Sequence, residues 1–262
     1  MKSIYVIGLL TLILLTGTAH AKLVTQSVPY TQDGVALQGY LAYDDTVSGK
    51  VPGVLVVHEW WGLNAYARSR AEKLARLGYV AFALDMYGKG KSTEHPDQAG
   101  AWMKAINSNM DQWLKRAEAG LEVLKKQPHV DVHRIAAIGY CFGGATVQVL
   151  AYGGEDLKGV VSFHGSLMPV SPEQAQRTKA KILICHGAQD PFNPPEALKN
   201  YVTAMNASKI DWQMVVYGNT RHGFTNPDAG KYGMDALAYN PSSDRRSWEQ
   251  MQFFFKEIFA GM

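Results

Sequence analysis

The segment that most clearly carries chemistry surrounds Cys141, where an apolar run ends in glycine-rich sequence. Residues 134–138 predict a buried strand, and Gly-Tyr-Cys-Phe-Gly-Gly follows at 139–144 before a helix begins. A strand, a sharp turn and a helix present a nucleophile on strained backbone, with small neighbours where strand and helix pass each other. The helix N-terminus favours a thiolate and a developing oxyanion. The alternative is a buried structural cysteine beside a glycine turn, but the strand–turn–helix context favours the nucleophile.

An acid and a histidine follow Cys141 in the chain order that this arrangement requires. A thiol, with an ordinary pKa of about 8.5, needs a base or an electropositive setting to react near neutrality. Asp190 ends a glycine-containing turn after the apolar run 182–185, and His222 lies in the loop after the run 212–217. The sequence therefore predicts a triad in which His222 takes the thiol proton and Asp190 fixes the tautomer of His222.

The loop at residues 58–64, His-Glu-Trp-Trp-Gly-Leu-Asn, lies between a predicted strand and a predicted helix. Such a loop donates one oxyanion-hole N–H, and the residue after the nucleophile donates the other. The predicted donors are therefore the backbones of Trp60 and Phe142. Glu59 is unusual because a carboxylate there opposes negative charge. It is either a surface acid or a switchable acid that interacts with Cys141 before substrate arrives, and the spacing leaves these interpretations equal.

The remaining histidines do not indicate a metal centre. His164 and His186 precede Asp190, which is the wrong order for the base, so we interpret them as hydrogen-bonded packing residues near the rim of the site. His58 is a candidate for shaping the oxyanion loop. No histidine pair has i, i+4 spacing or a cysteine at zinc-ligand spacing, so no metal site is predicted. The chemistry proposed for Cys141 needs no cofactor.

The elements that must position these residues are short strands alternating with helices. Residues 24–30 and 35–43 flank a Gln-Asp-Gly turn and predict a hairpin. Further strands are predicted at 51–57, 79–84, 134–138, 160–163, 182–185 and 212–217. Helices are predicted at 64–77, 111–126, 196–205 and the C-terminus, and surface loops at 88–96, 191–195 and 225–241. This pattern predicts an α/β fold with a mostly parallel sheet, helices on both faces and an N-terminal antiparallel hairpin. Sites in such sheets form at the carboxyl ends of the strands.

The composition is that of an ordinary globular protein. The chain has 262 residues, of which 47% are hydrophobic and 19% charged, which excludes a disordered or collagen-like chain. The formal charge of +3 comes without a dense Lys/Arg run, so no nucleic-acid partner is predicted. Two cysteines cannot make a disulfide framework. We interpret Cys185 as packing and expect both thiols to be free, although two thiols leave a redox role as a further alternative.

The first residues predict a secretory signal peptide. Lys2 is followed by an apolar run at 4–15 and by small residues at Ala19 and Ala21, so residues 1–21 are the expected signal with cleavage after Ala21. The run is short for a bilayer, which needs about 20 residues; an uncleaved anchor is the alternative. We expect residues 22–262 to form one domain, exported to a bacterial periplasm without stable membrane association. The sequence leaves the oligomeric state open and slightly favours a monomer.

The sequence from residue 22 onward resembles the dienelactone hydrolase (carboxymethylenebutenolidase-like) family of the α/β hydrolase superfamily. The matching motifs are His-Glu-Trp-Trp-Gly at 58–62, Ala-Leu-Asp-Met-Tyr-Gly at 83–88, Gly-Tyr-Cys-Phe-Gly-Gly at 139–144, Gly-Ala-Gln-Asp at 187–190 and His-Gly-Phe at 222–224. The resemblance implies the α/β-hydrolase fold and the triad of Cys141, Asp190 and His222. It also implies that Glu59 engages the resting thiol and moves when substrate binds.

The sequence departs from the family at the substrate-binding positions. Family members that open dienelactones hold the substrate carboxylate with two arginines. Lys89 stands at the first position and keeps the charge without the bidentate fork. Asn226 stands at the second and has no charge, so a carboxylate-bearing lactone is in doubt. An apolar, aromatic acyl pocket is suggested instead by Trp60, Trp61, Tyr87, Phe142 and Phe224.

The sequence thus predicts an exported cysteine hydrolase that cleaves ester or lactone bonds of small molecules through a thioester acyl-enzyme. The alternative is a non-catalytic periplasmic binding protein on the same scaffold, because a fold does not dictate function. A catalytic Cys141 should be alkylated in the native protein, whereas labelling only after unfolding would favour the binding protein.

Overall fold

The computed structural model describes residues 22–260, so the predicted signal peptide at residues 1–21 lies outside the described residues. Eight strands form one sheet in the order β1-β2-β4-β3-β5-β6-β7-β8. β1 (Leu23–Gln32) and β2 (Val35–Asp44) form an antiparallel hairpin, and β2 also pairs antiparallel with β4 (Val80–Leu84). All other neighbours are parallel. The predicted mostly parallel sheet with an N-terminal hairpin is confirmed.

The remaining elements agree with the predicted alternation of strands and helices, with three additions. The other strands are β3 (Val51–Val57), β5 (Val130–Tyr140), β6 (Gly159–Phe163), β7 (Lys181–Gly187) and β8 (Trp212–Tyr217), and the helices are α1 (Ala65–Ala75), α2 (Pro96–Asn107), α3 (Met110–Lys125), α4 (Phe142–Gly153), α5 (Pro172–Arg177), α6 (Pro195–Ala207), α7 (Pro241–Phe259) and the 3₁₀ helix η1 (Ala229–Tyr232). The sequence does not predict α2, α5 or η1. The predicted loop at 88–96 extends to Pro96, but Pro96 is the first residue of α2, where the missing N–H costs nothing.

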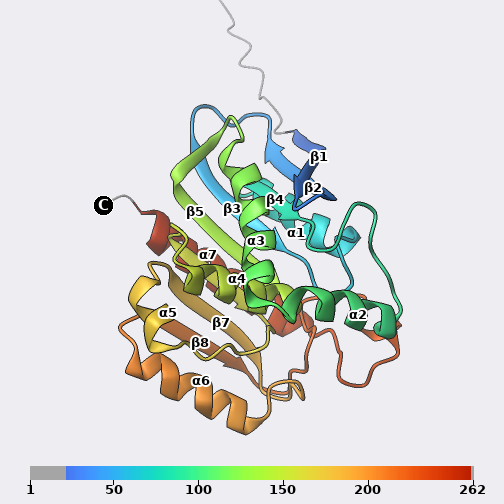
Figure 1. Ribbon diagram of the computed structural model, residues 1–262, viewed down its shortest axis with the longest axis vertical. Helices are drawn as coiled ribbons and strands as arrows, with labels where there is room; N and C mark the ends of the chain where they lie inside the picture. Colours follow the sequence, from blue (N-terminus) through green and yellow to red (C-terminus); the bar gives the residue numbers. More distant parts are fainter. Residues whose placement is uncertain (1–21, 261–262) are drawn as a thin grey trace, which may run out of the picture.

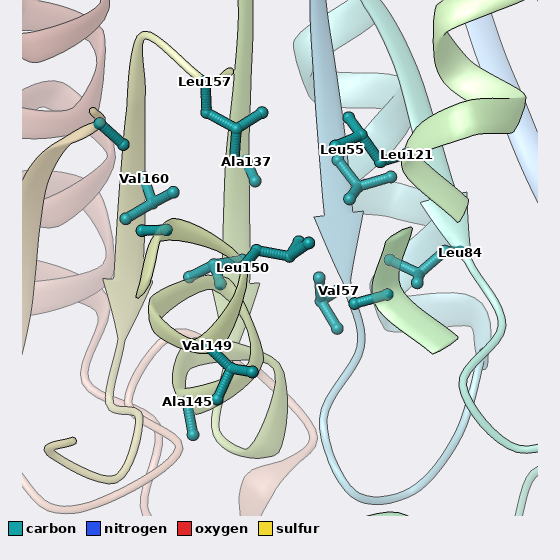
Figure 2. Close-up of a cluster of buried hydrophobic side chains, with 14 of the residues drawn as sticks. Leu55, Val57, Leu84, Leu121, Ala137, Ala145, Val149, Leu150, Leu157 and Val160 are labelled. Carbon is teal, nitrogen blue, oxygen red and sulfur yellow. The ribbon is translucent and has the colours of Figure 1, made fainter. Parts of the chain in front are cut away.

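Helices cover both faces of the sheet (Figure 1). α1 and α7 pack on one face, and α2 to α6 contribute to the core on the other. All residues of α4 from Phe142 to Tyr152 are buried. Figure 2 shows Leu150 of this helix among Val57 of β3, Ala137 of β5 and Val160 of β6, all members of one buried cluster. This packing fixes α4, and therefore also the turn that leads into it.

The parallel strands bring the predicted site residues to one edge of the sheet. Because β3, β5, β7 and β8 run in the same direction, their carboxyl ends lie at the same edge. Glu59 follows β3, Cys141 follows β5, Asp190 follows β7 and His222 follows β8. Over residues 22–260, no helix combines the length and apolar character that a bilayer crossing requires.

Candidate active site

The turn between β5 and α4 holds Cys141 in a backbone conformation that side-chain-bearing residues rarely adopt. Its φ is 53°. A Cβ on Gly139 would lie 1.9 Å from the carbonyl oxygen of Gly143, and a Cβ on Gly143 would lie 2.2 Å from that of Val57. Both positions therefore require glycine, and the predicted close passage of strand and helix is confirmed. Strained backbone of this kind persists where the surrounding structure enforces it, often at functional sites.

His164 supports the turn at Cys141 through a hydrogen bond to its backbone. The Cys141 N–H donates to the carbonyl of Phe163 at 3.0 Å and to Nδ1 of His164 at 3.1 Å. Because Nδ1 accepts, Nε2 carries the proton and donates to Thr225 Oγ1 at 2.7 Å. Burial, followed by the charge of His222, lowers the pKa of His164 well below its usual value and keeps the ring neutral. His164 is hydrogen-bonded as predicted, but it is fully buried under the turn rather than at the rim.

Asp190 and His222 are joined directly. Nδ1 of His222 lies 2.8 Å from Oδ2 of Asp190, and both side chains are buried. Asp190 also accepts from the backbone N–H of Phe192 at 2.9 Å and from Nδ2 of Asn193 at 3.1 Å. Burial raises the pKa of Asp190, but the hydrogen bond and charge of His222 outweigh it and lower the pKa overall. The carboxylate is thus ionised and orients the imidazole.

The second ring nitrogen of His222 is available for chemistry. Burial lowers the pKa of His222, but the adjacent Cys141 and the bonded Asp190 raise it to about 10. Nε2 is buried, and no hydrogen bond of regular geometry joins it to the Cys141 thiol or to any other group of residues 22–260. Cys141 and His222 line the same cavity. The structure therefore brings the three side chains together: Asp190 is bonded to Nδ1 of His222, and His222 lines the same cavity as Cys141.

The two residues predicted to donate the oxyanion-hole N–H groups belong to the wall of this cavity. Trp60 and Phe142 both line it beside Cys141. Phe142 is the first residue of α4, where a helix leaves its N–H without an intrahelical partner. His58 fixes the other donor loop, because its Nδ1 donates to the Glu59 carbonyl at 2.5 Å and its Nε2 accepts from the Met86 N–H at 3.2 Å. Burial lowers the pKa of His58, in keeping with this neutral tautomer.

Glu59 is a buried acid with a neutral partner. Its side chain is 4% exposed, so the surface-acid interpretation is wrong. Nδ2 of Asn226 donates to Oε2 of Glu59 at 2.7 Å, and no hydrogen bond joins Glu59 to Cys141 in the described part of the chain. Burial raises the pKa of Glu59 to about 7, although the Asn226 hydrogen bond and the charge of His222 lower it in part.

The cavity at Cys141 has a volume of about 450 Å³. Apolar and aromatic side chains make up most of its wall. The lining residues are Trp60, Met103, Asn107, Trp113, Cys141, Phe142, Ala145, Ser166, Met168, Phe192, His222 and Leu237. These twelve residues include no Lys, Arg, Asp or Glu, so the wall offers apolar contact and a few neutral polar groups beside the reactive pair.

The other predicted substrate-binding residues are not among those that line this cavity. Trp61 is buried against the ring of Tyr232, with ring centroids 3.9 Å apart. Tyr87 is buried behind Phe142, with centroids 5.7 Å apart. These aromatic residues support the loops from the core side. Spacing alone cannot show which side of a strand-end loop a ring occupies.

The remaining three predicted positions also lie outside the cavity lining. Phe224 is fully buried and packs edge-on against His164, with centroids 5.2 Å apart. Asn226 holds Glu59, as described above. Lys89 is exposed and does not line the cavity. Neither Lys89 nor Asn226 is therefore among the residues that line the cavity.

Several lining residues carry no sequence signal. Met103 and Asn107 belong to α2, which the sequence does not predict, and Met168 lies in a loop after β6. Trp113 lies on the buried stripe of the predicted helix at 111–126, and it stacks on Phe142 with centroids 5.5 Å apart. Only the position of Phe192, two residues after Asp190, could have suggested contact with the site.

Known proteins confirm the family of this chain. The model of the dienelactone hydrolase family matches residues 37–259. Protein usf of Aquifex pyrophilus is 29% identical, covering 88% of this chain and 98% of its own. The crystal structure of a dienelactone hydrolase-like promiscuous phosphotriesterase from metagenomic libraries is 38% identical with a TM-score of 0.87, covering 90% of this chain and 98% of that one. A structure named m3DLH is 40% identical, also with a TM-score of 0.87, covering 90% and 99%.

The chain belongs to the dienelactone hydrolase family and has the α/β-hydrolase fold. Membership of this family confirms the predicted enzyme class, a carboxylic ester or lactone hydrolase. In the structure Cys141 and Cys185 are both free. Residues 22–260 contain no cluster of three or more His, Cys, Asp or Glu side chains placed to hold a metal ion.

Proposed function

We propose that Cys141, Asp190 and His222 form the catalytic triad of an exported cysteine hydrolase that cleaves ester or lactone bonds of small molecules. One observation carries the proposal. Cys141 sits at φ 53° on the turn before α4, and the bonded His222–Asp190 pair opens on the same cavity. A nucleophile, its base and the group that orients the base are the three parts that such catalysis requires.

Acylation begins with the thiolate of Cys141. The sulfur attacks the substrate carbonyl carbon, and the backbone N–H groups of Trp60 and Phe142 bind the oxyanion. The carbon–oxygen bond to the leaving group then breaks. Nε2 of the His222 imidazolium gives its proton to the departing oxygen. The raised pKa of His222, about 10, keeps that proton available at neutral pH.

Deacylation uses the same histidine as a base. Once His222 is neutral, its Nε2 accepts a proton from water as the water oxygen attacks the thioester carbon. The tetrahedral intermediate collapses, the carbon–sulfur bond breaks, and the thiolate returns beside the imidazolium as the carboxylic acid leaves. Asp190 stays ionised throughout and stabilises the imidazolium.

Substrate turnover by the chain from residue 22 onward tests the triad. We expect hydrolysis of 4-nitrophenyl esters and enol lactones, with Cys141→Ala lowering kcat/KM at least about a thousandfold because the nucleophile is lost. Cys185→Ala is the matched control, since Cys185 is fully buried in β7 and burial raises the pKa of its thiol to about 12. Full turnover by the Cys141→Ala variant would rule out the mechanism.

Alkylation distinguishes a catalytic thiol from a binding-protein scaffold. Iodoacetamide should modify Cys141 in the native protein, and substrate analogues should protect it. Cys185 should react only after unfolding, because it is buried and its thiolate is disfavoured. Labelling of both thiols only after unfolding would favour the non-catalytic binding protein.

A second candidate activity is hydrolysis of neutral phosphotriesters. The cavity wall has no Lys, Arg, Asp or Glu, and an uncharged triester carries no charge of its own that would lose its hydration on entry. The 38% identical protein of known structure is described as a promiscuous phosphotriesterase. An aryl dialkyl phosphate therefore belongs in the substrate panel, and turnover that persists in Cys141→Ala would contradict this candidate.

Export is proposed from the composition of residues 1–21 and the small residues before the expected cleavage site. Expression of the full chain in a Gram-negative host should give a periplasmic protein that begins at Lys22. N-terminal sequencing checks the cleavage site, and Ala21→Asp should retain the precursor. A full-length chain found entirely in the cytoplasmic fraction would contradict export.

A further inference from the structure

We propose that the cavity at Cys141 selects uncharged substrates and excludes esters and lactones that bear a carboxylate. The inference rests on the proposed function and goes further, because it specifies which small molecules the site admits. It depends on what lines the cavity and on where the nearby cations point.

The cavity wall cannot replace the hydration of an anion. Beside the reactive pair, its neutral polar side chains include Asn107 and Ser166, and most of the others are apolar or aromatic. A carboxylate that enters loses its water and meets no lysine or arginine among the lining residues. Burying an ionised group without a partner is strongly unfavourable, whereas an alkyl or aryl group gains contact with the same wall.

The buried arginines of the described chain are committed elsewhere. Arg70 donates to Asp244 at 2.8 Å and to the backbone of Thr225. Arg116 donates to the Met86 carbonyl at 3.0 Å. Neither lines the cavity. Lys89 is exposed and also lies outside the wall, so its positive charge is screened by water.

His222 does not supply the missing cation. Its imidazolium is already balanced by Asp190 at 2.8 Å, and the Cys141 thiolate adds a second negative charge beside it. A substrate carboxylate would be a third anion near one cation. Glu59 directly precedes Trp60 in the loop after β3, and its negative charge above neutral pH would oppose an anion further.

A matched pair of esters measures this selectivity. 4-Nitrophenyl methyl succinate and 4-nitrophenyl hydrogen succinate share the leaving group and acyl chain, but only the second carries a carboxylate. After subtraction of the uncatalysed rates, kcat/KM at pH 8 should favour the neutral diester by about a hundredfold, reflecting the cost of an unpaired carboxylate. A ratio below tenfold would overturn charge selectivity while leaving the proposed hydrolase intact. Failure to hydrolyse either ester in a Cys141-dependent way would overturn the proposed function, and this inference with it.

Two variants identify the cause of the selectivity. Asn107 is the half-buried last residue of α2, so Asn107→Lys adds a cation at the wall that can reach solvent. It should raise kcat/KM for the anionic ester at least tenfold relative to the neutral one, while the uncharged control Asn107→Met keeps the original ratio. Lys89→Ala should also keep the wild-type ratio of kcat/KM between the two esters. An unchanged ratio in Asn107→Lys, or a selective loss on the anionic ester in Lys89→Ala, would overturn the inference.

Discussion

The buried acid Glu59 makes the stability of the protein depend on pH in a direction opposite to that of a typical salt-bridged carboxylate. Its side chain is 4% exposed, and its hydrogen-bond partner is the neutral amide of Asn226. Burial raises the pKa of Glu59 from 4.5 to about 7. The folded state therefore holds a proton that the unfolded chain releases between these two values. The contribution of Glu59 to stability is present below about pH 4.5 and is lost as pH rises through about 7.

The size of the effect follows from the shift. One pKa unit corresponds to about 1.4 kcal/mol, so ionised Glu59 costs the folded state about 3 kcal/mol. Glu59→Gln removes this cost, because a neutral amide has nearly the same shape and its Oε1 still accepts from Asn226. The variant should match the wild type near pH 4.5 and exceed its free energy of unfolding by about 3 kcal/mol at pH 8. In a domain of this size that difference raises Tm by roughly 6–12 °C.

Guanidinium unfolding of both proteins at several pH values between 4.5 and 8 measures this difference. Both proteins contain the same other ionisable side chains, so the titration of His222 largely cancels in the comparison. Glu196→Gln is the matched control, because Glu196 is exposed at the start of α6. Replacing an exposed carboxylate relieves no burial cost, so the stability of this variant relative to the wild type should not rise with pH. If the Glu59→Gln difference stays constant with pH, or if the wild type gains on the variant as pH rises, the reasoning is refuted.

Two further predictions concern the support of the site. Asn226→Leu removes the hydrogen bond that favours the Glu59 carboxylate, so the pKa of Glu59 should rise further, by about one unit. The pH dependence of the free energy of unfolding of this variant, measured relative to the same substitution in the Glu59→Gln background, should then shift to higher pH. An unchanged pH dependence would contradict this prediction. Gly139→Ala places a Cβ 1.9 Å from a backbone oxygen and should abolish folded, active protein, whereas Gly218→Ala, with no atom within 4 Å of its Cβ, should change the free energy of unfolding by less than about 1 kcal/mol. Soluble yield and urea unfolding measure both, and an active, stable Gly139→Ala protein would contradict the prediction.

The strand–turn–helix at Cys141 can be predicted from the sequence because a tight turn restricts which residue types can occupy it. The turn needs glycine where β5 and α4 meet, and the short apolar run before the glycines favours a buried strand, which the structure shows as β5. The positions of Asp190 and His222 follow from parallel strands, whose carboxyl ends share an edge. Chain order and strand direction together are therefore enough to place three side chains that are far apart in sequence.

The cavity wall could not be predicted in the same way. Met103 and Asn107 reach it from α2, whose proline start resembles the end of a loop. Trp61 has the same residue type as the lining residues Trp60 and Trp113, and Tyr87 is aromatic like them, but both are buried against other rings. Which side of a loop a ring faces depends on tertiary packing, and no local spacing encodes it.

The burial of Glu59 resolves the conflict between this acid and the proposed oxyanion hole. An ionised Glu59 would weaken binding of negative charge at the neighbouring Trp60 backbone, and a surface location would have ionised it at neutral pH. Burial raises the pKa of Glu59 to about 7 and leaves a substantial fraction neutral there. Asn226 satisfies the acid without supplying charge. The same amide brings no charge to the acid, which suits both a neutral Glu59 and the proposed preference of the cavity for uncharged substrates.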